Sequence, residues 1–100
     1  MFIFTTVGQL NVNSRNTVKY LLYSSVGCHL CEEALALCLQ VIASSQITVV
    51  DILDDDDKEP EEPGSLYSQY GISIPVLKNQ QSQQELFWPF DLHALQEFIQ

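Results

Sequence analysis

Residues 18–53 have the sequence VKYLLYSSVGCHLCEEALALCLQVIASSQITVVDIL, and their pattern predicts three successive elements of secondary structure. The apolar run over 18–23 is rich in β-favouring residues and predicts a buried strand, which ends at the polar turn that follows. Residues 28–43 contain no Gly or Pro and carry apolar side chains at helical spacing, which predicts a largely buried helix. Residues 47–53 are again almost continuously apolar and predict a second strand. This order predicts a right-handed βαβ unit with parallel strands covered on both faces.

The second half of the chain predicts a short helix, a hairpin and a final helix. A helix over 66–70 is expected, with Gly71 at its C-terminal end. Residues 76–78 and 85–88, joined by a polar turn, predict an antiparallel pair of strands. Asp91 has the side chain and position of an N-cap for the last helix. From residue 18 onward the expected order is therefore βαβαββα.

The length of 100 residues suits one domain with its own core. Residues 18–100 are predicted to form that domain, and residues 1–17 to be an N-terminal extension that is either disordered or an added edge strand. No apolar run approaches the roughly 18 to 20 residues that cross a bilayer, and the apolar start has no basic leader, so neither anchor nor secretory signal is predicted. An odd count of three cysteines argues against a disulfide-stapled secreted scaffold, and a cytoplasmic location is expected.

Negative charge is concentrated in one segment. The net charge is −9, and residues 51–62 hold eight acidic residues and one lysine, a net charge of −7. Four Lys and Arg residues in the whole chain are too few to neutralise several phosphates, so neither nucleic acid nor an anionic membrane is an expected partner. Any basic protein partner would dock at the acidic segment. Its aspartates at 54–57 lack the spaced Gly and Glu of an EF-hand, which favours a solvated loop over a calcium site.

The motif Cys28-His29-Leu30-Cys31 places two thiols one turn apart at the start of the predicted helix. At this spacing their Cα atoms can approach within the roughly 4.4 to 6.8 Å that a disulfide needs. The helix N-terminus favours an anion, so Cys28 is expected to form a thiolate at a lower pH than the ~8.5 of a free cysteine. Protonated His29 would reinforce this effect and Glu32 would oppose it. We therefore expect Cys28 to attack a substrate disulfide and Cys31 to resolve the mixed disulfide, with no bound metal or organic cofactor.

A Cys-x-x-Cys pair is also typical of one half of a zinc site, which needs further ligands. The other candidates are His29, Cys38 and His93. Cys38 lies seven residues after Cys31, about 10.5 Å along a helix, on the predicted core face, so we expect a buried and inert thiol. His93 is expected to be a surface residue of the last helix. A metal or iron–sulfur carrier that completes its site with glutathione or a second chain remains an alternative, as does a binding module without redox turnover.

Three motifs carry a resemblance to a known family: the residues from Gly27 to Glu32, the pair Tyr70-Gly71, and the run from Ile74 to Leu77. Together with the βαβαββα order, they make the chain from about residue 18 similar to small bacterial glutaredoxin-like proteins. The resemblance implies an α/β thioredoxin-like fold, with a four-stranded mixed sheet and helices on both faces. It also implies a thiol–disulfide oxidoreductase.

The resemblance further implies three substrate-binding residues. The peptide bond between Ile74 and Pro75 is expected to be cis and to face the dithiol, so that the Ile74 backbone can hydrogen-bond an extended substrate. His29, between the two cysteines, is the third. The implied partners are a disulfide-bearing protein or a glutathione mixed disulfide, with glutathione as a candidate reductant. Ser25 and residues 87–91 replace the family's usual glutathione-contacting Lys and Gly-Gly-x-Asp turn, so the usual glutathione contacts are not predicted.

Overall fold

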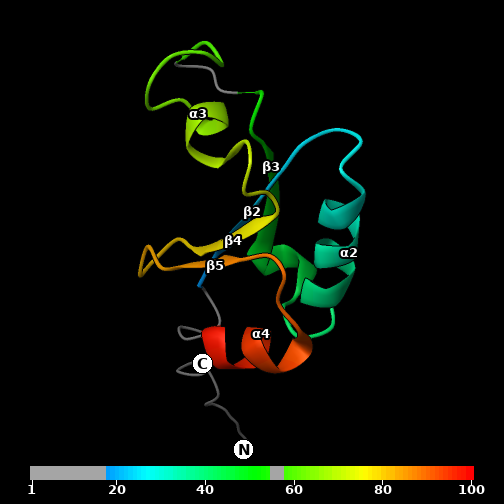
Figure 1. Ribbon diagram of the computed structural model, residues 1–100. Coiled ribbons are helices and arrows are strands. Elements are labelled where there is room, and N and C mark those ends of the chain that lie inside the picture. Colours follow the sequence, from blue (N-terminus) through cyan, green and yellow to red (C-terminus); the bar gives the residue numbers. More distant parts are fainter. Residues whose placement is uncertain (1–17, 55–57) are drawn as a thin grey trace, which may run out of the picture.

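The computed structural model describes residues 18–54 and 58–100 of the protein. Residues 1–17, predicted to be an extension or an added strand, lie outside the described residues. The described chain follows the predicted βαβαββα order, with one short 3₁₀ helix, η1, added after the first helix (Figure 1). The elements are β2 (Tyr20–Ser24), α2 (His29–Cys38), η1 (Ser44–Gln46), β3 (Ile47–Asp51), α3 (Leu66–Tyr70), β4 (Val76–Asn79), β5 (Glu85–Phe87) and α4 (Leu92–Phe98).

The four strands form one mixed sheet in the order β3-β2-β4-β5. β2 pairs in parallel with β3 and antiparallel with β4, and β4 pairs antiparallel with β5. The sheet is thus the four-stranded mixed sheet that the family resemblance implies. Because β2 and β3 are parallel, the chain leaves both strands at the same edge of the sheet, where α2 begins (Figure 1).

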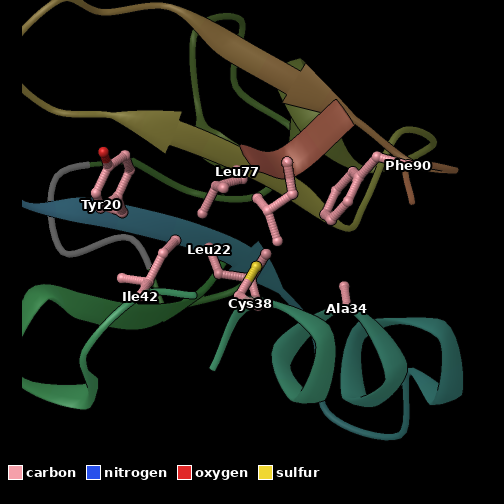
Figure 2. Packing of buried hydrophobic residues seen from close by; sticks show 8 residues of the cluster. Tyr20, Leu22, Ala34, Cys38, Ile42, Leu77 and Phe90 are labelled. Atoms are coloured by element: carbon pink, nitrogen blue, oxygen red, sulfur yellow. The ribbon is translucent and has the colours of Figure 1, made fainter. Parts of the chain in front are cut away.

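Alternate residues of the central strands build two separate cores, one on each face of the sheet. On the first face, Leu22 and Leu77 are fully buried and pack with Cys38 of α2 and Leu95 of α4. Figure 2 shows Leu22 and Leu77 of the sheet close to Cys38 of α2. Phe90, which precedes α4, completes this cluster. Helices α2 and α4 therefore cover the same face.

Helix α3 covers the opposite face. Tyr70 of α3 packs with Tyr23, Ile52 and Val76, and its ring stacks on the Tyr23 ring at a centroid distance of 4.3 Å. Its hydroxyl donates a hydrogen bond to a Glu85 carboxylate oxygen. Burial, followed by this hydrogen bond, raises the pKa of Tyr70, so the phenol stays protonated and remains a donor. The predicted arrangement with helices on both faces is confirmed.

The first helix is shorter than the 28–43 span predicted from its apolar spacing. It ends at Cys38, and the chain then tightens into turns in which the N–H groups of Gln40 and Val41 donate to the carbonyls of Leu37 and Cys38. A helix of ten residues rises about 15 Å, close to the roughly 16 Å of a five-residue strand. The chain must turn there to begin β3 beside β2. Ile42 is buried as expected, but it lies in the turn after α2 and not in the helix.

The expectation that the strand over 47–53 is covered on both faces is wrong. β3 ends at Asp51, whose carboxylate accepts a hydrogen bond from the Leu53 N–H at 2.9 Å and turns the chain. Within the described part of the chain, β3 has one strand neighbour and forms an edge of the sheet. Thr48 and Val49 are exposed as a result.

Asp91 and Gly71, the two residues predicted to mark helix ends, both lie at the expected ends, but the reason for glycine at position 71 differs from the expected one. Asp91 caps α4 by accepting a hydrogen bond from the Ala94 N–H at 2.8 Å, as predicted. Gly71 follows α3, but its φ of −53° is right-handed. A Cβ at Gly71 would lie 2.6 Å from the Tyr67 carbonyl oxygen, so the position favours glycine because space is lacking. None of the helices formed by residues 18–54 and 58–100 is long and apolar enough to cross a membrane.

Candidate active site

The two cysteines of the motif form a disulfide at the start of α2, with their Cα atoms 5.2 Å apart. Cys28 is the N-cap, one residue earlier than the first-turn position predicted for it, and its N–H donates to the Ser25 carbonyl at 3.2 Å. The preceding Gly27 has a φ of +79°, a left-handed conformation that residues with a Cβ avoid. The turn between β2 and α2 thus delivers Cys28 to the helix N-terminus.

The two sulfur atoms differ in exposure and in hydrogen bonding. Cys28 is partly exposed, and its Sγ accepts a hydrogen bond from the Cys31 N–H at 3.1 Å. Cys31, one turn deeper, is only 2% exposed. An attacking thiolate must reach a substrate and gains from N–H donors at a helix start, whereas a resolving thiol needs to reach only its neighbour. The geometry therefore favours Cys28 as the attacking residue.

Acidic side chains surround the exposed histidine of the motif. His29 Nε2 lies 3.3 Å from a Glu33 carboxylate oxygen, and Nδ1 lies 3.9 Å from one of Glu32. All three side chains are on the solvent side of the first turns of α2. The predicted substrate-binding residue His29 is thus accessible beside Cys28, within a locally acidic surface.

The register of the sheet relates the Ile74–Pro75 peptide bond to the dithiol. Tyr23 pairs with Val76, so Pro75 lies level with Ser24, where the chain leaves β2 for the cysteine motif. The Ile74–Pro75 bond is cis, which confirms the isomer implied by the resemblance. Pro75 itself is fully buried.

Two further backbone features lie beside this bond. The Ile74 N–H already donates to the Tyr70 carbonyl at 3.1 Å. Among the described residues no group donates to the Ile74 carbonyl oxygen. A second cis bond, between Trp88 and Pro89, was not predicted, and its only local signal in the sequence is the aromatic-Pro pair. Trp88 and Phe90 pack edge to face at 5.1 Å in the core on the α2 side of the sheet.

A pocket of about 220 Å³ opens beside the disulfide and was not predicted. It lies between the start of α2 and the β2–β3 edge of the sheet, and both Cys28 and Cys31 line it. Leu35 and Val49 form apolar parts of its wall, and Glu32 lies on it as well. The pocket could not be predicted because the strand over 47–53 was expected to be covered on both faces, which would have hidden Val49.

The remaining metal-ligand candidates do not gather at the dithiol. In the described ranges, no group of three or more His, Cys, Asp and Glu side chains is arranged to hold a metal ion. Cys38 is buried in the core, as predicted. His93 is exposed on α4 and lies 3.6 Å from a Glu97 carboxylate oxygen, which agrees with its predicted surface position.

Cys38 is expected to resist alkylation in the folded, reduced protein. Burial raises its pKa from 9.0 to about 11, so at pH 8 the thiol is protonated as well as inaccessible. Iodoacetamide followed by mass spectrometry should add at most two groups to the folded protein and three after unfolding. Because the folded state holds this proton more tightly, Cys38 should also make folding less stable as pH rises from about 9 to 11. Rapid addition of a third group without denaturant would contradict this prediction.

A thioredoxin-like sheet with a Cys-x-x-Cys motif at the start of the helix that follows β2 is typical of thiol-redox proteins. Comparisons with known proteins identify the family within this class. Residues 19–100 match the family described as "Glutaredoxin-like domain (DUF836)". The chain is also similar to a solved structure, the X-ray structure of Northeast Structural Genomics target protein XcR50 from X. campestris. The two share 32% sequence identity and a TM-score of 0.63, over 80% of this chain and 93% of that one. A search of curated proteins finds no match. The chain belongs to the glutaredoxin-like (DUF836) family.

Proposed function

We propose that the protein is a thiol–disulfide oxidoreductase that works through Cys28 and Cys31. The observation that carries the proposal is the difference between the two thiols. Cys28 is partly exposed and its sulfur accepts a backbone N–H, while Cys31 is buried one turn below. A purely structural disulfide has no need of this asymmetry, whereas a two-step exchange reaction uses it.

The reaction starts from the reduced dithiol. The Cys28 thiolate attacks one sulfur of the substrate disulfide, forms a mixed disulfide and releases the first substrate thiolate. Cys31 then loses its proton and attacks the Cys28 sulfur, which releases the second substrate thiolate and closes the Cys28–Cys31 disulfide. Two electrons pass from the dithiol to the substrate, and the two released substrate thiolates take up from solvent the protons that the Cys28 and Cys31 thiols lose. The same steps run in reverse when the partner is a dithiol.

The residues around the dithiol are assigned roles in holding the substrate. The Ile74 carbonyl is the group that would accept a substrate N–H, because the Ile74 N–H already bonds to Tyr70. Pro75 is buried and would act by positioning Ile74. His29 would contact the substrate from the exposed side of the helix.

Regeneration requires an external thiol reductant, for which glutathione is the simplest candidate in a cytoplasmic setting. The proposed cycle needs no bound metal or organic cofactor, since cysteine sulfurs carry both electrons. A disulfide-bearing protein and a glutathione mixed disulfide are the two partner classes.

The mixed disulfide provides the direct test. A Cys31→Ser variant lacks the resolving thiol, so the adduct through Cys28 should accumulate after mixing with a peptide disulfide. Intact-mass and peptide mass spectrometry should find one peptide on Cys28, and dithiothreitol should release it. The wild-type protein is the matched control and should yield the closed disulfide with free peptide thiol. An adduct that forms equally well in a Cys28→Ser/Cys31→Ser double variant would overturn the proposal.

A further inference from the structure

We propose that the dithiol acts on disulfides in protein segments that carry an apolar and a basic side chain beside the cysteine, in preference to glutathione disulfides. The inference rests on the proposed function and names the substrate class of the same site. Its basis is the surface within reach of Cys28, which is apolar at the pocket and acidic at its rim.

The apolar part is the pocket that both cysteines line. Val49 on its wall is 49% exposed, and Val26 at its mouth is 88% exposed. A volume of about 220 Å³ is below the roughly 300–1,000 Å³ of typical small-molecule sites. It suits a single apolar side chain that enters next to the reacting sulfur. Because Cys28 is at the wall, the residue that fills the pocket would neighbour the substrate cysteine.

Negative charge at this pocket comes from the first turns of α2. On α2, Glu32 lines the pocket and Glu33 follows it. At the same edge of the sheet, Asp51 pairs with Ser24, and the Ile52 N–H donates to the Ser24 carbonyl at 2.9 Å. The ends of β2 and β3 therefore lie side by side, and the chain after β3 then runs toward α3 (Figure 1).

The lysines in the described ranges lie elsewhere. Lys19 precedes β2, at the far end of that strand from the motif, and its Nζ donates to the Ser45 carbonyl at 3.1 Å. Lys78 pairs with Leu21, two positions along β4 from Val76. Lys58 lies next to Gly64, in the connection before α3. Glutathione is a net anion with two carboxylates, so this surface repels it, whereas a basic protein segment complements it.

The test compares disulfides that differ in one side chain. The substrates are the symmetric disulfides of the capped tripeptides Leu-Cys-Lys, Leu-Cys-Glu and Gly-Cys-Lys, and glutathione disulfide. Each single-turnover rate with the reduced full chain is divided by the rate with dithiothreitol, which removes intrinsic reactivity. Leu-Cys-Lys should react about tenfold faster than Leu-Cys-Glu and glutathione disulfide, and several-fold faster than Gly-Cys-Lys. The charge effect should shrink as salt is raised.

Reversing the charge of Glu32 tests whether the preference for a basic substrate arises at the rim of the pocket. Glu32→Lys should lower the ratio of the Leu-Cys-Lys rate to the Leu-Cys-Glu rate by about fivefold. A ratio is measured because any change in Cys28 reactivity affects both substrates equally. The matched control is Glu97→Lys, an exposed helix glutamate that also lies beside a histidine but is on α4. For Glu97→Lys, the ratio of the Leu-Cys-Lys rate to the Leu-Cys-Glu rate should equal that of the wild type.

A second variant tests the pocket. Val49→Lys should lower the Leu-Cys-Lys rate more than the Gly-Cys-Lys rate, because only the former fills the pocket. Equal slowing of both substrates would overturn the inference and indicate that the pocket belongs to the chain's own packing. Rates per molecule that fall with protein concentration would overturn it in favour of a second copy seated there.

The outcomes separate the two proposals. If glutathione disulfide reacts as fast as Leu-Cys-Lys, or if charge has no effect, the substrate class is wrong and the oxidoreductase proposal stands. If none of the four disulfides is reduced, the proposed function itself fails.

Discussion

Replacing Cys28 with serine is expected to lower the rate of disulfide reduction by at least about 1,000-fold. Serine is similar in size, and its hydroxyl oxygen can replace the Cys28 sulfur as the N-cap acceptor, but it does not form a nucleophilic anion near neutral pH. Cys31 cannot take over the attack, since it is only 2% exposed and lies beneath Cys28. The measurement is the single-turnover rate of the reduced variant with a peptide disulfide, after circular dichroism has established that it is folded.

Cys38→Ala is the matched control for this loss. Cys38 is buried in the core away from the dithiol, so its removal should leave the rate within about twofold of the wild type. A Cys28→Ser protein that retains wild-type turnover would exclude the proposed mechanism. Equal losses in the Cys28 and Cys38 variants would point to general damage to the fold.

Truncating Leu77 to alanine is expected to cost about 3 kcal/mol of the free energy of unfolding. Leu77 is fully buried on the central strand β4 and lies opposite Leu22 of β2, so the cavity has little room to collapse. A domain of this size has roughly 5–15 kcal/mol in total. The expected fall in melting temperature is on the order of 12–24 °C. The change in the free energy of unfolding is measured by urea unfolding, with the disulfide closed in every sample.

The control is the same substitution at Leu39, the C-cap residue of α2, which is 45% exposed. Leu39→Ala should cost less than about 1 kcal/mol, because little apolar surface leaves a packed site. Similar losses at both positions would contradict the assignment of the core to the β2–β4 centre of the sheet.

The order of elements could be predicted because each segment carries its own local signal. The apolar run at 18–23, the helical spacing after Cys28 and the cap at Asp91 each have a signal within a few residues. The end of the first helix could not be predicted from such signals. Apolar spacing continues to Ile42, whereas the helix stops at Cys38 because the next strand must begin level with Tyr20.

In the candidate site, too, one part could be predicted from the sequence and another could not. The cysteine motif is visible in the sequence because its chemistry depends on a spacing of three residues. The pocket beside it was not visible, since Leu35 and Val49 meet there only through the pairing of β2 with β3. The hydrogen bond from the Ile74 N–H to the Tyr70 carbonyl could not be predicted either, because it depends on the turn that follows α3.

The amino-acid sequence alone was enough to predict the βαβαββα order, the position of the Cys28–Cys31 dithiol and the acidic character of the chain after β3, because these are properties of neighbouring residues. The difference in exposure between Cys28, which is partly exposed, and Cys31, which is buried, is visible only in the folded structure. The tertiary structure also decided that β3 forms an edge of the described sheet, and that acidic and apolar side chains meet beside the disulfide. Exposure and proximity arise from strand order and register, and these depend on contacts between segments far apart in the chain.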